Sequence, residues 1–143
     1  MKRNAGFTLL EILVVVTIIT ILATFVGLSV FREPARAKVA ITRAQIATLS
    51  AALKLYQMRN GTLPTQEQGL QALVEKPQTP PVPSNWQEGG YLDSRQVPRD
   101  GWGHEYVYFC PGPRGEPFLV LSYGADGQPG GQGDNADITN EDQ

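Results

Sequence analysis

Hydrophobic and polar residues are distributed very unevenly along this chain of 143 residues. An uncharged, mostly apolar run extends from Ile12 to Phe31, and a helix of about 20 apolar residues is long enough to cross the hydrocarbon core of a bilayer. The run therefore predicts a membrane-spanning helix near the N-terminus. Glu11 stands directly in front of it, where an unpaired charge would cost at least a few kcal/mol and so calls for a partner.

Beyond the apolar run the pattern becomes that of a helix with one buried face. Mostly apolar residues recur at spacings of three, four and seven, and basic or amide side chains fall between them. The recurring positions are Val39, Thr42, Ile46, Leu49, Leu53 and Tyr56, and the polar ones are Lys38, Arg43, Gln45, Lys54 and Gln57. We expect one long helix from Phe7 to about Asn60, kinked near Pro34 and ended by Gly61.

Short elements joined by turns make up the rest of the chain. Thr65 and Gln68 have the spacing of a capping box, which marks the start of a helix. Clustered prolines predict an extended connector, and alternating residues around an irregular loop predict a β-hairpin. In chain order, we expect a short helix over 65–74, a surface connector over 77–84, a tight turn over 99–103 and strands over 105–110 and 117–122.

Size, charge and cysteine content limit the kind of protein that this can be. About 110 residues remain outside the apolar arm, which is enough for one small domain. The formal net charge of −2, without a basic cluster, argues against nucleic-acid binding. The single cysteine, Cys110, is interpreted as a small buried hydrophobe or as a reactive thiol, and the single histidine, His104, as a surface or turn residue. No second histidine or nucleophile motif supports an enzymatic centre.

The charges at the extreme N-terminus indicate an orientation. Lys2 and Arg3 precede the apolar run, as they would in a secretory signal, but the run is too long for one and no A-x-A-like cleavage site follows it. Positive charges favour the cytoplasmic side of a membrane. We therefore expect residues 1–6 in the cytoplasm and the domain after Phe31 outside it.

The residues around Glu11 suggest how its charge could be paired. A bond that follows Gly6 is open to a membrane-embedded peptidase, and cleavage there would leave the positive amine of Phe7 as the new N-terminus. In an assembly of staggered helices, Glu11 of one subunit could pair with that amine of the next. Glu11 could instead mark the headgroup boundary of a single anchor, and the residues alone leave both interpretations open.

The C-terminal tail from Ser122 to Gln143 is crowded with glycine and aspartate. Calcium binds about six to eight oxygen ligands, commonly carboxylates and carbonyls of a tightly folded loop. The candidate side chains are Asp126, Asp134 and Asp137, with Asn135 and Ser122 as neutral donors. Their spacing is not that of an EF-hand, and a disordered acidic tail is the alternative.

Four segments resemble one family. The stretch Gly6-Phe7-Thr8-Leu9-Leu10-Glu11-Ile12 resembles the class III signal of type IV pilins and type II secretion pseudopilins, in which the leader is removed after Gly and the new terminal Phe is N-methylated. The other three are similar to the major pseudopilins of type II secretion systems, so that the resemblance covers nearly the full length. They are residues 63–74, the Asp-Gly-Trp-Gly of 100–103, and the stretch from Ser122 through Gly130-Gly131 to Ile138.

The resemblance implies an α+β fold in which a long N-terminal helix, membrane-spanning in its first half, packs on a small antiparallel sheet with a C-terminal calcium loop. Residues 1–6 would be a cleaved leader, 7–31 a transmembrane or filament-core helix and 32–143 a periplasmic domain. Major pseudopilins bind structural Ca²⁺ in this loop. By position, the implied ligands are Asp126, the carbonyls of Tyr123 and Gly131, and Asp134 and Asp137.

The implied function is structural rather than enzymatic: a subunit that polymerises into the periplasmic pseudopilus of a type II secretion system and drives export of folded proteins across the outer membrane. Its partners would be further copies of the chain, minor pseudopilins, the prepilin peptidase, and the secretion platform protein and ATPase. It would be a single-pass protein of the bacterial inner membrane. The alternatives are a type IV pilin or minor pilin for adhesion or DNA uptake, and an anchored calcium-binding module that does not polymerise.

Overall fold

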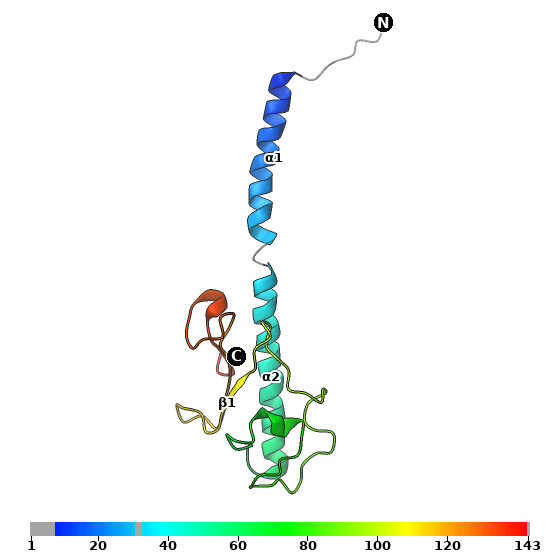
Figure 1. Ribbon diagram of the computed structural model, residues 1–143, viewed down its shortest axis with the longest axis vertical. Coiled ribbons are helices and arrows are strands. Elements are labelled where there is room, and N and C mark those ends of the chain that lie inside the picture. The colour runs from blue at the N-terminus through cyan, green and yellow to red at the C-terminus, as the bar shows by residue number, and fades with distance from the viewer. Residues whose placement is uncertain (1–7, 31–32, 143) are drawn as a thin grey trace. The chain divides into compact units, whose positions relative to one another are not determined.

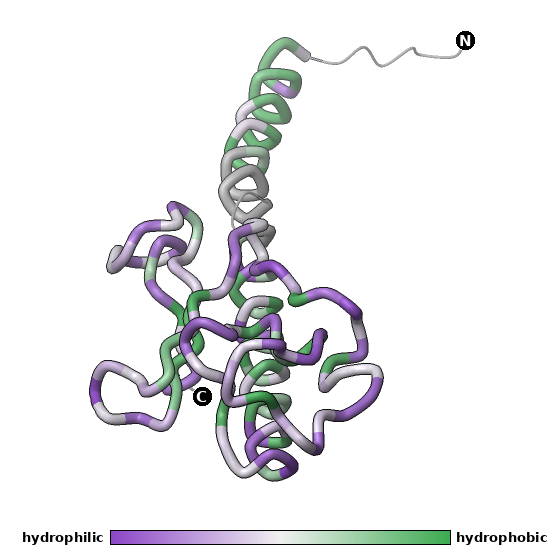
Figure 2. The backbone as a smooth tube through the Cα atoms, turned by 60° about the horizontal axis from the view of Figure 1, so that its bottom comes forward, coloured by the Kyte–Doolittle hydropathy of each residue, from purple (hydrophilic) through white to green (hydrophobic). Residues whose placement is uncertain are grey.

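The computed structural model describes residues 8–30 and 33–142, in two compact units that divide after Ala35. The first unit contains α1 (Leu9–Val30; Figure 1). The tube of Figure 2 colours most of the described part of this helix as hydrophobic. Those side chains, residues 9–23, are all exposed. Among the described residues, no helix combines the length and apolar character needed to span a bilayer. The kink expected near Pro34 stays a prediction, because residues 31–32 lie outside the described part.

The second unit is built on α2 (Glu33–Asn60). The predicted stripe is confirmed as the buried face of this helix: Ile46, Leu49 and Leu53 are fully buried and Tyr56 nearly so. The helix ends where predicted. Gly61 has a φ of 79°, a conformation that favours glycine, and its N–H donates to the Gln57 carbonyl at 2.8 Å.

Three short strands form an antiparallel sheet in the order β1-β2-β3. The predicted hairpin is confirmed with shorter strands, β1 (Val107–Phe109) and β2 (Leu119–Ser122), in a register that pairs Tyr108 with Val120. The third strand, β3 (Ile138–Thr139), was not predicted; it pairs with the other edge of β2. The predicted α+β class is therefore correct. The tail that carries β3 is folded, so the disordered alternative is wrong.

The short helix expected over 65–74 is observed only as a 3₁₀ turn, η1 (Leu70–Leu73). The capping box itself is confirmed in both directions: the Gln68 N–H donates to Thr65 Oγ1 at 3.2 Å, and the Thr65 N–H donates to Gln68 Oε1 at 3.1 Å. Gly69, with a φ of 59°, interrupts the first turn. Because this left-handed conformation cannot be part of an α-helix, the segment continues as a tighter 3₁₀ turn.

The core lies between α2, η1 and the sheet. Its buried residues outside α2 include Leu73, Tyr91, Tyr108, Val120 and Ile138. Cys110 is a free thiol that is partly buried against this core, which supports its interpretation as a small hydrophobe.

Candidate functional site

The first predicted site lies at the start of α1. Gly6 and Phe7 are outside the described residues, so cleavage and N-methylation at this bond stay predictions. Glu11 lies in the first turn of α1. Its N–H donates to Thr8 Oγ1 at 3.2 Å, and the Ile12 N–H donates to the Thr8 carbonyl at 3.2 Å. Thr8 is therefore the N-cap of this helix.

This cap gives Glu11 a second role, as the acidic residue in the first turn of its own helix, which was not among the expectations above. Thr8 and Glu11 have the Thr-x-x-Glu spacing of a capping box, so the signal was present in the sequence. A carboxylate in the first turn is stabilised by the partial positive charge of the helix N-terminus. The position of Glu11 is thus favourable within its own helix, whatever else it contacts.

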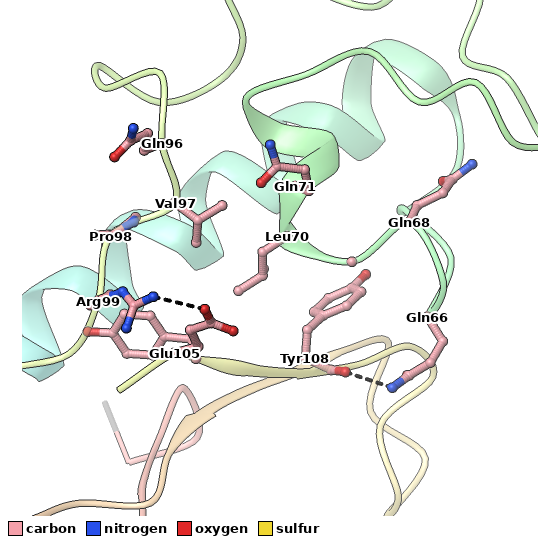
Figure 3. A pocket seen from close by; sticks show the side chains of 12 residues that line it. Gln66, Gln68, Leu70, Gln71, Gln96, Val97, Pro98, Arg99, Glu105 and Tyr108 are labelled. Carbon is pink, nitrogen blue, oxygen red and sulfur yellow. Dashed lines mark hydrogen bonds and ion pairs between the residues drawn. The ribbon is translucent and has the colours of Figure 1, made fainter. Parts of the chain in front are cut away.

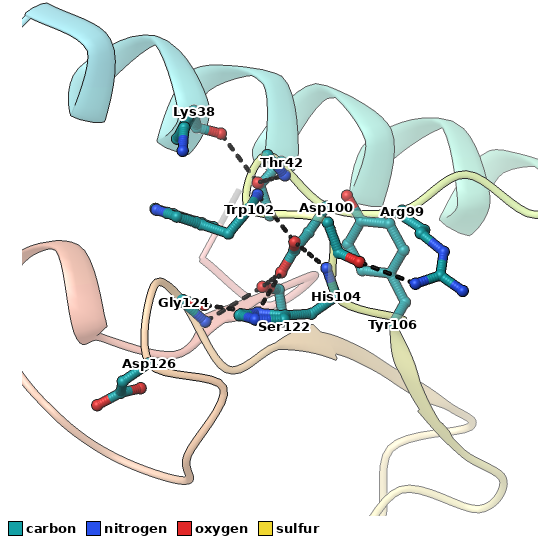
Figure 4. Close-up of polar contacts among 12 residues, drawn as sticks. Lys38, Thr42, Arg99, Asp100, Trp102, His104, Tyr106, Ser122, Gly124 and Asp126 are labelled. Carbon is teal, nitrogen blue, oxygen red and sulfur yellow. Dashed lines mark hydrogen bonds and ion pairs between the residues drawn. The ribbon is translucent and has the colours of Figure 1, made fainter.

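A second constellation surrounds Asp100, in the predicted tight turn over 99–103. The side chain of Asp100 is fully buried. Its Oδ1 accepts hydrogen bonds from the N–H groups of Trp102 at 3.0 Å and His104 at 2.8 Å, while Oδ2 accepts one from the Ser122 hydroxyl at 2.5 Å (Figure 4). One carboxylate therefore fixes the shape of the turn and joins it to the end of β2.

The same turn is held against α2 by a backbone contact. The Gly101 N–H donates to Thr42 Oγ1 at 2.9 Å, and the Thr42 hydroxyl donates to the Lys38 carbonyl at 2.9 Å (Figure 4). A Cβ atom added to Gly101 would lie 2.5 Å from that carbonyl oxygen, closer than real Cβ contacts allow. Glycine is required here because the backbone of the turn touches the backbone of the helix.

His104 links this network to the C-terminal loop. Its Nδ1 lies 3.1 Å from the Gly124 carbonyl oxygen and 3.7 Å from Asp100 Oδ2. The expected turn position is correct, but the contact with Gly124 could not be predicted, because the two residues are twenty positions apart. The first part of the C-terminal loop is thereby attached to the Asp100 turn.

The predicted calcium ligands lie on the loop between β2 and β3. Asp126 Oδ1 accepts from the Gln128 N–H at 3.1 Å, and both oxygens of Asp137 lie 3.0 Å from the Gly130 nitrogen. Asp134 belongs to the 3₁₀ turn η2 (Gly133–Asn135), and its carbonyl accepts from the Ala125 N–H at 2.9 Å. At Gly131, with a φ of 90°, a Cβ would meet the Asn135 carbonyl oxygen at 2.5 Å.

These hydrogen bonds close the loop, but they do not bring the carboxylates of Asp126, Asp134 and Asp137 close together. In the described part of the chain, no three His, Cys, Asp or Glu side chains are placed so that they could hold a metal ion. Asp126 lies apart from the Asp100 network (Figure 4), and Ser122, a suggested neutral donor, is buried and bonded to Asp100 instead. The donor chemistry suits calcium, because every candidate ligand is an oxygen.

Comparisons with known proteins agree with this architecture. Residues 29–141 match the family described as "Type II secretion system (T2SS), protein G", and residues 1–27 match the prokaryotic N-terminal methylation motif. The chain is 45% identical over 141 residues to the type II secretion system core protein G of Pseudomonas aeruginosa. This alignment covers 99% of this chain and 97% of that protein. The corresponding protein of Vibrio cholerae is 46% identical over 142 residues, covering 98% and 93% of the two chains.

A solved structure shows the same fold. The crystal structure of the major pseudopilin from the type 2 secretion system of enterohaemorrhagic Escherichia coli superposes with a TM-score of 0.63 at 34% identity, covering 76% of this chain and 90% of that one. The fold and the N-terminal motif define a pseudopilin of the N-methylated class. The chain belongs to the type II secretion system protein G family, a family of structural pseudopilins rather than enzymes.

Proposed function

We propose that this chain is a structural subunit of the pseudopilus of a type II secretion system, and that its polymerisation in the periplasm drives export of folded proteins across the outer membrane. The observation that carries the proposal is the family match over residues 29–141 together with the shared pseudopilin fold. The methylation motif over residues 1–27 supports maturation by a prepilin peptidase and anchoring in the inner membrane by a single pass.

The surface of α1 supports an assembling protein. Its apolar side chains are exposed over residues 9–23, for example Leu9 at 86% and Leu10 at 70%. A contiguous apolar surface of this kind requires a covering. Lipid would supply it while the subunit is in the inner membrane, and helices of neighbouring copies would supply it in the filament. Minor pseudopilins and the secretion platform protein and ATPase are the further partners that such assembly needs.

Analysis of the mature N-terminus tests this function. Mass spectrometry of the chain purified from membranes of a secretion-competent cell should find a methylated Phe7 as the first residue. The control is the unaltered chain from cells that lack the prepilin peptidase, in which Met1 should be retained. An intact Met1 in peptidase-positive cells would contradict the proposal.

We also propose that the loop between Tyr123 and Asp137 holds one structural calcium ion. Asp126, Asp134 and Asp137 would supply carboxylate oxygens, and Tyr123 and Gly131 would supply carbonyl oxygens. Binding would require the loop to draw the three carboxylates together, because they are not gathered in the described part of the chain. Support comes from the oxygen-only donor set and from the hydrogen bonds that close the loop. Bound calcium would reduce the repulsion among these carboxylates and stabilise the loop.

The melting temperature of the detergent-solubilised chain tests the calcium site. Calcium should raise this temperature relative to a chelator, because a ligand that binds only the folded state stabilises it. The Asp126→Ala variant should lose the difference, whereas Asp93→Ala, which alters an exposed aspartate outside the loop, should keep it. Equal melting temperatures of the unaltered chain with calcium and with chelator would refute the site.

A further inference from the structure

The outer edge of β1 is unusual because a side chain takes the place of a neighbouring strand. β1 is the first strand in the order β1-β2-β3, so no strand of the described residues lies beside its second edge. The Gln66 Nε2 donates to the Tyr108 carbonyl at 2.9 Å, and the Cys110 N–H donates to Gln66 Oε1 at 3.0 Å (Figure 3 shows the first of these bonds). The amide of Gln66 thus acts as the peptide group of a missing strand. It covers only the C-terminal half of the edge.

The other half of the edge is open. Val120, which lies opposite Tyr108, directs its backbone toward β3: its N–H donates to Asn140 Oδ1 at 2.8 Å and its carbonyl accepts from the Asn140 N–H at 3.1 Å. Tyr108 and Val120 are therefore a non-hydrogen-bonded pair of the antiparallel ladder. Since both backbone groups of such a residue point to the same side, the Tyr108 N–H points outward, as its carbonyl does.

Tyr108 is one of the residues that line a cavity of about 500 Å³ between β1, η1 and residues 96–99 (Figure 3). Of the described residues that line it, only Arg99 and Glu105 are charged, and they pair with each other at 3.1 Å. The other lining residues are uncharged and include Leu70 and Val97, and four of them are glutamines. The volume lies within the range of ligand sites, and the walls carry no net charge.

We propose that the open half of the β1 edge binds an extended, uncharged segment of a partner protein by strand addition. The Tyr108 N–H would donate to a carbonyl of that segment, and its side chains would lie against Leu70 and Val97. Main-chain hydrogen bonds give affinity in this mode of recognition, and pockets for alternate side chains give specificity. An uncharged segment is favoured because Arg99 and Glu105 already pair with each other, and a charged segment could gain a counter-charge only by competing with that ion pair.

The partner is a different protein rather than a second copy of this chain. The uncharged extended segment 77–84 is a poor candidate, because Pro77, Pro80, Pro81 and Pro83 lack the N–H that a ladder requires and Pro83 is buried. The carbonyls of Thr79 and Pro81 already accept from Gln68 of the same chain. The C-terminal loop is acidic and closed on itself. The proposal concerns a surface of the folded domain and does not depend on filament formation.

Titration of the ¹⁵N-labelled full chain in detergent micelles with the blocked peptide acetyl-Thr-Val-Thr-Val-Thr-amide tests this site by NMR. We expect a saturable shift of the Tyr108 amide signal and slower hydrogen exchange at that amide. The same peptide with alternate backbone nitrogens methylated should bind on the order of tenfold more weakly, because methylation removes strand hydrogen bonds. A peptide with aspartate in place of threonine should also bind more weakly.

Two tryptophan variants complete the experiment. Gln71→Trp places a bulky ring at the mouth of the cavity from an exposed residue that makes no side-chain hydrogen bond among the described residues, and it should abolish the shift. Gln57→Trp, on the exposed face of α2 away from the cavity, should leave it unchanged. The proposal fails if the Tyr108 signal does not move, if methylated and unmodified peptides bind equally, or if Tyr108 becomes protected with rising concentration of the chain alone.

Discussion

At the scale of single residues, Thr42 shows how one hydroxyl group can join two elements. It is fully buried, donates to the Lys38 carbonyl in its own helix, and accepts from the Gly101 N–H of the Asp100 turn. The hydrophobic pattern assigned Thr42 correctly to the buried face of α2. Its second contact depends on a turn 59 residues away and has no sequence signal.

The Thr42→Val change should lower the free energy of unfolding by about 1–3 kcal/mol, because it keeps the shape of the side chain but leaves the Gly101 N–H without its acceptor. The control is Thr48→Val, which removes an exposed hydroxyl bonded only within its helix. Urea unfolding of the detergent-solubilised chain, followed by tryptophan fluorescence, measures both. Equal losses in the two variants would contradict the role assigned to Thr42.

Burial also affects ionisation at Tyr106. Its hydroxyl donates to Gln45 Oε1 at 2.5 Å; burial, and secondarily the charge of Asp100, raise the pKa of this phenol above its ordinary value of 10.0. The folded state therefore disfavours the ionised form. The contribution of Tyr106 to the free energy of unfolding is therefore fully present below the pKa that this tyrosine has in the unfolded chain. It is lost as the pH rises above that value.

We expect the unfolding free energy of the chain to decrease above about pH 10, and to decrease less steeply in Tyr106→Phe. Tyr108, whose pKa is also raised chiefly by burial, should account for part of the remaining slope. Urea unfolding at a series of pH values between 8 and 11, with absorbance of the phenolate as a parallel signal, provides the measurement. An unchanged slope in the variant would show that Tyr106 ionises equally well in both states.

At the scale of elements, Gln66 is part of the sheet although it lies outside every strand. Its side chain completes two positions of the β1 edge. Gln66→Leu should lower the free energy of unfolding by about 1–3 kcal/mol. The Tyr108 carbonyl and the Cys110 N–H lose their hydrogen-bond partner, while the volume of the side chain at position 66 is nearly kept. Gln57→Leu, on the exposed side of α2, should be within about 0.5 kcal/mol of the unaltered chain. A loss no larger than that of the control would show that water replaces the Gln66 amide without cost.

Regular periodicity decided which elements could be predicted. The stripe on α2 is long enough to identify a helix, and the alternation around β1 identified the first strand of the hairpin. β2 is buried throughout and shows no alternation. The capping box at Thr65 and Gln68 was correct in detail. Three short elements, η1, η2 and β3, were not predicted as they occur. η1 is not an α-helix because Gly69 adopts a left-handed conformation, and β3 has only two residues, too few for a pattern.

At the scale of the whole molecule, function followed from the motif and not from geometry. The family was predicted correctly from the four segments of the sequence that resemble pilins and pseudopilins. The Asp100 network could not be predicted, because its members come from the turn, β2 and the loop and meet only after folding. The roles of Glu11 and of the calcium ligands stay predictions.

Removal of the Glu11 charge should prevent assembly without unfolding the domain. We expect Glu11→Gln to abolish sheared pseudopilus fibres seen by electron microscopy on overexpression, because the Phe7 amine of the next subunit loses its counter-charge. Glu88→Gln removes an exposed charge from the second unit and should leave fibres intact. The cap hydrogen bond from the residue 11 N–H to Thr8 survives in Glu11→Gln, so lost fibres would report the charge alone. Normal fibres would favour the headgroup-boundary interpretation.

The Gln66 amide has a further consequence for a protein that gathers in many copies. Strand edges that are long and open join to one another and cause aggregation. β1 has three residues, and half of its edge is already covered by Gln66. What remains can receive a single short peptide but offers too few groups for two sheets to fuse. Even at high local concentration, copies of the domain should therefore not join to one another through their β1 edges.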